Sequence, residues 1–83
     1  MRIQQIDIDK IIFIKKEYSN SMYESIKRIG LSFPIKVIME NGKYYCQDGH
    51  KRISAIKDMI DEEDYQKRRK INIIVMNNGN SRS

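Results

Sequence analysis

Cysteine and histidine are nearly missing from this 83-residue chain, which has one of each, Cys46 and His50. A single cysteine cannot form an internal disulfide, and one cysteine with one histidine cannot complete a zinc site. No apolar run approaches the roughly 20 residues that cross a bilayer, and no export signal follows the N-terminus. We therefore expect a cytoplasmic protein with no metal centre built from cysteine and histidine and no membrane anchor.

The chain also has only a small charge imbalance. Sixteen basic and eleven acidic residues leave a net charge of +5, which is mildly attractive to nucleic acid or nucleotides. This excess is short of the dense basic surface of a dedicated DNA-binding protein. At 40% hydrophobic and 33% charged residues, the composition suits a single small globular domain. We expect this domain to span 1–76 and a flexible polar tail to follow over 77–83.

Apolar periodicity predicts the strands. They are expected over 2–8, 34–39, 44–47 and 71–76. The alternation slips at Gln4-Gln5, which indicates a bulge in the first strand. Residues 11–14 are continuously apolar and could form a short strand or a packed loop. Asn41-Gly42 predicts a hairpin between two of the strands.

Helical spacing and end signals predict the helices. One is expected from the serine-rich segment 19–21 to Gly30, and if Ser21 is its N-cap, Glu24 completes a capping box. A second is expected from Gly49 to about residue 59, and a third, shorter helix over 61–70. The fold class is therefore α+β, with a small mixed sheet of about four strands and two to three helices.

The stretch 44–55 carries the strongest functional pattern, a strand followed by a glycine turn and a helix. Gly49 allows a sharp turn or a close approach to a ligand, and the free N–H groups of a helix start attract anions. Lys51 and Arg52 add full charges, and arginine can hold a phosphate with two hydrogen bonds. The pattern predicts a phosphate site. Alternatively, Asp48 is only an N-cap, and Lys51 and Arg52 are only a solvated helix face.

Other titratable residues are weaker catalytic candidates. His50 could transfer a proton or contact a phosphate beside the turn, or it could be an exposed polar residue. Glu17 and Glu24 could act as general bases or Mg²⁺ ligands, although capping and solvation explain both. Cys46 is more typical of a small core residue than of a nucleophile.

Four consecutive basic residues, Lys67, Arg68, Arg69 and Lys70, form the remaining candidate site. They follow an acidic stretch, 61–64, and opposite charges at the two ends of a segment match a helix dipole. A cluster of four bases also suits contacts with a phosphate backbone, so this segment is a weak nucleic-acid candidate.

The order of these patterns resembles the superfamily of ParB N-terminal domains and sulfiredoxins, over roughly residues 3–76 and in a minimal form. The landmarks are Ile6-Asp7-Ile8-Asp9-Lys10-Ile11, Ser25-Ile26 to Gly30-Leu31, Pro34-Ile35-Lys36-Val37, and Asp48-Gly49-His50-Lys51-Arg52 with Ala55. The resemblance implies that the Gly-x-x-Arg turn holds nucleotide phosphates: those of CTP in ParB proteins, of ATP in sulfiredoxins, and of ADP or ATP in free serine kinases. It thus implies a nucleoside di- or triphosphate with Mg²⁺, bound at Asp48, Gly49, His50, Lys51 and Arg52.

The chain departs from the best-known members of this superfamily. Sulfiredoxins have a catalytic cysteine directly after the glycine of this turn, where this chain has His50, so sulfiredoxin chemistry is not expected. ParB proteins have an Asn-Pro-x-x-Pro-Arg-like segment where 15–18 stands here. They also have a Glu-Asn-Ile-Gln-Arg-like segment and a helix-turn-helix that these 83 residues lack. Asp48-Gly49-His50 is more similar to the serine-kinase-like and nuclease-like branches, whose catalytic acids would correspond at best to Glu17 or Glu24.

Three functions stay open. The first is a regulatory or partner-binding nucleotide-binding domain, linked to DNA or plasmid maintenance. The second is a small phosphotransferase or nuclease that uses the same turn, with His50 or a glutamate as proton acceptor. The third is an adaptor that binds DNA or a DNA-bound protein and has a degenerate nucleotide pocket.

Overall fold

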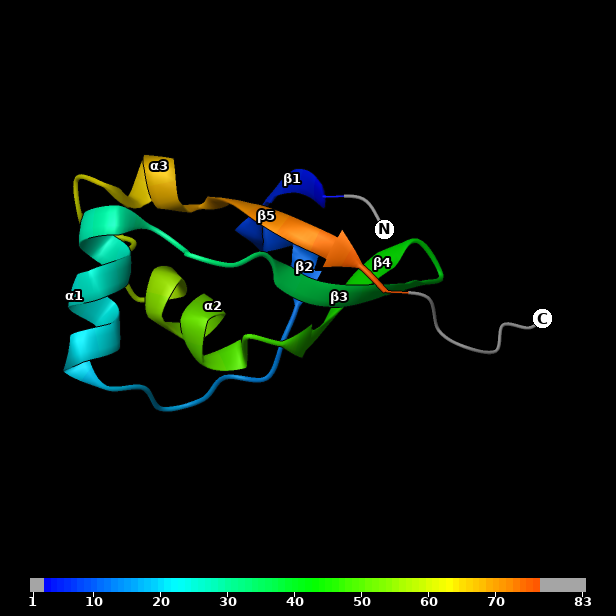
Figure 1. The fold of residues 1–83 in the computed structure, drawn as a ribbon, viewed down its shortest axis with the longest axis horizontal. Coiled ribbons are helices and arrows are strands. Elements are labelled where there is room, and N and C mark those ends of the chain that lie inside the picture. The colour runs from blue at the N-terminus through cyan, green and yellow to red at the C-terminus, as the bar shows by residue number, and fades with distance from the viewer. Residues whose placement is uncertain (1–2, 77–83) are drawn as a thin grey trace.

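Five strands and three α-helices make up the computed structural model, which describes residues 3–76 (Figure 1). In chain order the elements are β1 (Ile3–Asp7), the 3-10 turn η1 (Ile8–Lys10), β2 (Ile11–Ile12), α1 (Asn20–Ile29), β3 (Ile35–Glu40), β4 (Lys43–Asp48), α2 (His50–Lys57), α3 (Tyr65–Arg68) and β5 (Lys70–Val75). The α+β class is confirmed. The segment 11–14, for which a strand and a packed loop were both possible, contains the short fifth strand β2. The expected tail, 77–83, lies outside the described residues.

The strands form one mixed sheet in the order β1-β5-β3-β4-β2. The predicted hairpin joins β3 and β4, and its two turn residues, Asn41 and Gly42, have φ of +54° and +77°. β5 lies between β1, to which it is antiparallel, and β3, to which it is parallel. β1 pairs with β5 without a register shift, so the bulge predicted at Gln4-Gln5 is wrong. The irregularity lies instead in the β3–β4 pair, between Lys36 and Val37.

The core is built mainly from isoleucine. α2 supplies Ile53 and Ile56, the sheet supplies Ile35 and Ile73, and all four side chains are fully buried. Each such side chain contributes about 1.5–3 kcal/mol through burial. Figure 1 shows the three helices gathered at one end of the sheet, while the β3–β4 hairpin extends at the other.

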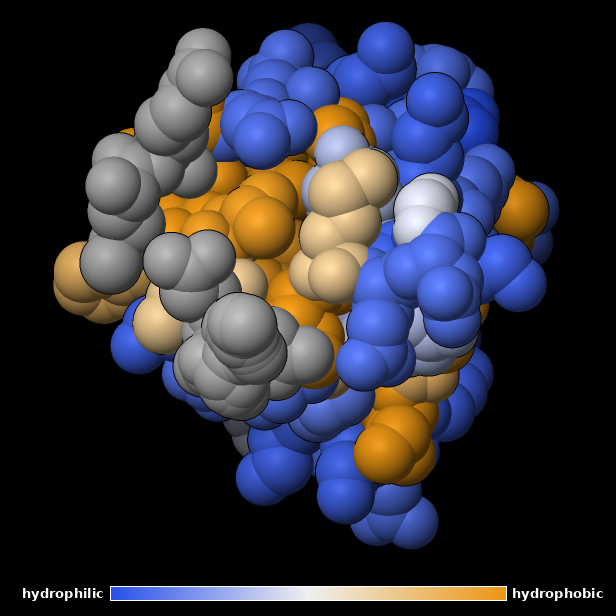
Figure 2. Space-filling view, turned by 90° about the vertical axis from the view of Figure 1, so that its right-hand side faces the viewer, coloured by the Kyte–Doolittle hydropathy of each residue, from blue (hydrophilic) through white to orange (hydrophobic). Residues whose placement is uncertain are grey.

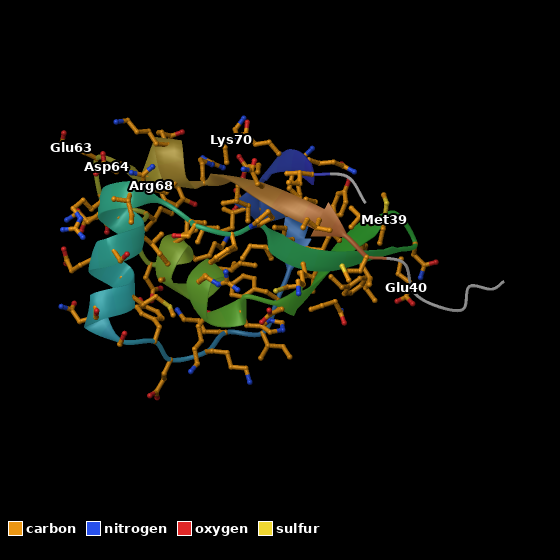
Figure 3. The ribbon with its side chains drawn as sticks, in the orientation of Figure 1. Met39, Glu40, Glu63, Asp64, Arg68 and Lys70 are labelled. Carbon is orange, nitrogen blue, oxygen red and sulfur yellow. The ribbon has the colours of Figure 1, made fainter. Side chains whose placement is uncertain are left out.

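The end of the molecule that carries the hairpin exposes apolar side chains among polar ones (Figure 2). Met39, which is labelled at this end in Figure 3, is 50% exposed. Within residues 3–76, no helix has both the length and the apolar character needed to cross a membrane.

The ends of α1 differ in part from the prediction. Ser19 is the N-cap, and its hydroxyl accepts a hydrogen bond from the Met22 amide at 3.1 Å. Ser21 therefore lies inside the helix, and the capping box with Glu24 is wrong. The helix ends as predicted at Gly30, which has a φ of +80°.

The third helix is much shorter than the predicted 61–70. Only Tyr65–Arg68 is helical, and the acidic residues before it lie in turns. The reason is tertiary. Glu62 forms an ion pair with Lys27 of α1 at 3.0 Å and accepts a hydrogen bond from the Tyr23 hydroxyl at 3.1 Å. These contacts lower the pKa of Glu62. They hold its carboxylate against α1, so it does not lie in the first turn of a longer third helix.

Candidate functional site

A tight backbone turn at Gly49 joins β4 to α2. Its φ is +113°, a value that strains any residue with a side chain. The space is also taken, because a Cβ on Gly49 would lie 2.5 Å from Cδ1 of the buried Ile35 in β3. Glycine is therefore needed here for both conformation and close packing, as the sequence pattern predicted.

The first turn of α2 is open to a ligand. Gly49 is the N-cap and no side chain caps the helix, so the alternative in which Asp48 serves as the N-cap is wrong. The amides of the first turn, from His50 to Arg52, have no acceptor within the helix. Together with the helix dipole, they form a positive end that suits an anion.

The Arg52 side chain folds back over the turn. Its Nη2 atom lies 3.4 Å from the position that a Cβ on Gly49 would occupy. The same atom is 4.0 Å from Oδ2 of Asp48, the outer limit of an ion pair. The side chain of Arg52 is 27% exposed, and that of Asp48 is 67% exposed. Arg52 is thus held beside the turn by weak contacts that an anion could replace.

The five residues predicted for the phosphate site line one hollow of about 350 Å³. The hollow is also lined by Lys16 and Met22, which sequence reasoning did not assign to the site. A second hollow, of about 440 Å³, shares Met22 and Arg52 with the first. Its lining includes four serines, Ser19, Ser21, Ser25 and Ser32. A cationic hollow thus adjoins one that is rich in hydroxyl groups.

Lys16 reaches the site because α2 holds the preceding segment of chain. The Nδ1 atom of His50 accepts a hydrogen bond from the Ile14 amide at 3.0 Å. The hydroxyl of Ser54 accepts one from the Lys16 amide at 2.9 Å and donates one to the His50 carbonyl at 2.7 Å. Ser54 is fully buried, and these two bonds satisfy it.

Asp58, four positions after Ser54, contacts the same segment of chain. Its carboxylate forms an ion pair with Lys15 at 2.8 Å and accepts a hydrogen bond from the Tyr18 hydroxyl. The Lys15 contact, and then the Tyr18 contact, lower the pKa of Asp58. Residues four apart share a helix face, so His50, Ser54 and Asp58 together fasten residues 14–18 along α2.

The geometry assigns His50 a structural contact. Because Nδ1 accepts a backbone hydrogen bond, the neutral ring carries its proton on Nε2. Glu17 and Glu24, the other catalytic candidates, are exposed, and neither lines the two hollows. Cys46 is 6% exposed, and burial raises the pKa of its thiol to about 11, as suits a core residue.

The four consecutive bases do not act as one surface. Arg68 donates hydrogen bonds to the carbonyls of Lys27 at 3.2 Å and Arg28 at 3.1 Å, at the end of α1. Lys67 and Lys70 are exposed.

Arg69 is turned elsewhere, toward two acidic residues and an aromatic ring. Its Nε atom lies 2.9 Å from Asp7, and its Nη2 atom lies 2.8 Å from Asp9. The guanidinium also lies 5.3 Å from the ring centre of Tyr65. The charge of Arg69 is therefore already neutralised. The other three bases, Lys67, Arg68 and Lys70, line one pocket.

The comparisons with known proteins identify the fold. No family model matches the chain, and no curated protein does. Among solved structures, the chain is similar to the crystal structure of sulfiredoxin from Arabidopsis thaliana, with a TM-score of 0.70 and 24% identity. The likeness covers 92% of this chain and 85% of the sulfiredoxin chain. The predicted ParB/sulfiredoxin-like fold is therefore confirmed, and the likeness extends no further than the fold.

Proposed function

We propose that this protein binds a nucleotide through its phosphates at the turn formed by 48–52. The observation that carries the proposal is the convergence of the Arg52 guanidinium and the uncapped α2 amides on one hollow over Gly49. Two further cations, Lys16 and Lys51, line that hollow. Charge-assisted hydrogen bonds from arginine and from helix amides are a common way to hold phosphate groups.

The adjoining hollow supports a nucleoside rather than inorganic phosphate alone. Its serine hydroxyls can hydrogen-bond a sugar or a base edge, and Met22 supplies an adaptable apolar contact. Among the described residues, Asp48 is the one carboxylate that lines the phosphate hollow. Mg²⁺ commonly takes one or two protein carboxylates together with phosphate oxygens, so Asp48 would hold it here.

The arrangement favours binding over catalysis. Nδ1 of His50 is occupied by the Ile14 amide, and Glu17 and Glu24 lie outside both hollows. A nucleotide would instead connect the first turn of α2 with α1. We therefore infer a regulatory nucleotide-binding domain. Any link to DNA or plasmid maintenance would then depend on this nucleotide-bridged contact between α1 and α2.

A thermal-shift panel of CTP, ATP, ADP, GTP and UTP, with and without Mg²⁺, tests the proposal. A nucleotide at 100 times its Kd stabilises the folded state by about 2.7 kcal/mol. In a domain this small, each kcal/mol raises Tm by roughly 4–8 °C. Arg52→Gln should abolish the shift, whereas Arg28→Gln, which removes the same charge from the exposed side of α1, should retain it. Either no shift with any nucleotide or an equal shift in the Arg52 variant would refute the proposal.

A further inference from the structure

A second cationic pocket shares the loop formed by 30–33 with the serine-rich hollow. It has a volume of about 230 Å³ and lies between this loop and the junction of α3 and β5. The residues that line it include three cations, Lys67, Arg68 and Lys70, and two amides, Gln5 and Asn72. Figure 3 shows Arg68 and Lys70 on the side of the molecule that carries α3 and β5. Neither Gly49 nor Arg52 contributes to this pocket.

The positive charge of this pocket is not neutralised by its own lining, in which none of the described residues is acidic. The acids nearest along the chain, Glu63 and Asp64, are not in that lining, and three other acids are paired elsewhere. Asp7 and Asp9 pair with Arg69, and Glu62 pairs with Lys27. The pocket therefore attracts anions.

Arg68 makes such an anion acceptable next to the end of α1. The last carbonyls of a helix are partly negative and would repel a phosphate. Here the guanidinium of Arg68 covers two of them through its Nε and Nη2 atoms. Its Nη1 atom lies 3.4 Å from the Cβ position of Gly30, so the guanidinium also forms part of the pocket wall.

Phe33 supplies an aromatic surface at the same place. It is 72% exposed, the highest value among the large apolar side chains of the described residues, and it lines both this pocket and the serine-rich hollow. The next residue, Pro34, fixes the local backbone, so the ring is presented from a restricted loop. Exposed aromatic rings beside cations are the usual platform for stacking unpaired bases.

We propose that this pocket binds a single-stranded nucleic acid, with backbone phosphates at Lys67 and Lys70 and a base stacked on Phe33. Gln5 and Asn72 offer amide donors and acceptors that suit a base edge. Cations alone would also suit an acidic polypeptide, but such a chain would leave the aromatic ring and the amide pair unused. A duplex would keep its bases stacked inside, away from the ring.

Fluorescence anisotropy of the full chain with a short labelled oligothymidylate tests this site. For single strands, the slope of log K against log salt changes by about 0.7 for each phosphate neutralised. Replacing both lysines in a Lys67→Gln, Lys70→Gln variant should therefore make the slope shallower by about 1.4 over roughly 50–200 mM salt. A Lys10→Gln, Lys43→Gln variant removes the same charge beside another hollow and should keep the original slope.

Variants at position 33 test the stacking contact. Phe33→Ala and Phe33→Leu should each weaken binding about fivefold or more, whereas Phe33→Tyr, which keeps the ring, should bind like the parent protein. Because the side chain is 72% exposed, these substitutions should leave the fold intact, which circular dichroism can verify. Phe33 also lines the serine-rich hollow, so Arg52 and the two lysines, rather than Phe33, separate this site from the proposed nucleotide site. Arg52 does not line this pocket, and Arg52→Gln should leave strand binding unchanged.

Several outcomes would overturn the proposal. One is a duplex of the same length that binds as tightly as the single strand. Another is polyglutamate that competes as well as unlabelled oligothymidylate, which would identify an acidic polypeptide as the ligand. A third is equal binding by the two double-lysine variants. Loss of strand binding in Arg52→Gln with retention in the Lys67, Lys70 variant would place the strand at Gly49 instead.

Discussion

Gly49→Ala tests the geometry on which the phosphate site depends. The substitution has two separable costs. At a φ of +113°, a Cβ strains the backbone by about 1–2 kcal/mol. The same Cβ would lie 2.5 Å from Cδ1 of Ile35, a fully buried side chain, and overpacking of this kind costs about 1–3 kcal/mol. We expect the variant to lose about 2–5 kcal/mol of unfolding free energy.

Ile35→Val separates the two costs, because it removes the Cδ1 atom that the new Cβ would strike. Alone, this change should cost about 0.5–1.5 kcal/mol. Combined with Gly49→Ala it relieves the clash but not the backbone strain. The double variant should therefore be more stable than the sum of the two single effects predicts, by about 1–3 kcal/mol.

Urea unfolding followed by circular dichroism gives the free energy of unfolding of the parent protein, the two single variants and the double variant. A domain of this length has about 4–12 kcal/mol to lose, so Gly49→Ala should remain partly folded and its midpoint measurable. If Gly49→Ala proves unfolded in buffer, recovery of a folded state in the double variant would still show the steric coupling. Additivity within about 0.5 kcal/mol would show that Ile35 does not press on the turn, and the account of this glycine would then be wrong.

Two predictions follow from the pKa shifts. The pKa values of Asp58 and Glu62 are lowered, mainly by Lys15 and Lys27, so their stabilising contributions are present above the usual carboxyl pKa and are lost as the pH falls below about 5. Acid unfolding should therefore be less steep in Asp58→Asn, and an unchanged profile would contradict this. The pKa of Cys46 is raised to about 11, so iodoacetamide should alkylate it roughly 100-fold more slowly in the folded protein than in urea, and comparable rates would argue against burial.

The turn could be predicted from sequence because its chemistry is local. A glycine between a strand and a helix, followed by basic residues, forms the same kind of cationic turn in most tertiary contexts. Asp48 to Arg52 accordingly meet at one hollow. The hairpin at Asn41-Gly42 and the end of α1 at Gly30 were predictable for the same reason, since each depends on a positive φ that glycine or asparagine tolerates.

The parts that could not be predicted depend on contacts between distant segments. Lys16 belongs to the site only because Ser54, 38 positions along the chain, accepts a hydrogen bond from its amide. Asp58 fixes Lys15 across 43 positions in the same way. A serine or aspartate on a helix is ordinarily read as a cap or a solvated residue. Nothing in its neighbours along the sequence distinguishes one that holds a remote loop.

The basic cluster shows why adjacency along a chain is a poor guide to adjacency on a surface. Consecutive side chains at the α3–β5 junction leave the backbone in different directions, so Arg68 reaches the end of α1 while Arg69 reaches Asp7 and Asp9. Lys67, in α3, and Lys70, the first residue of β5, nevertheless line one pocket. Because Arg69 is paired with Asp7 and Asp9, the charge available to a ligand there comes from these two lysines and Arg68 rather than from four consecutive bases.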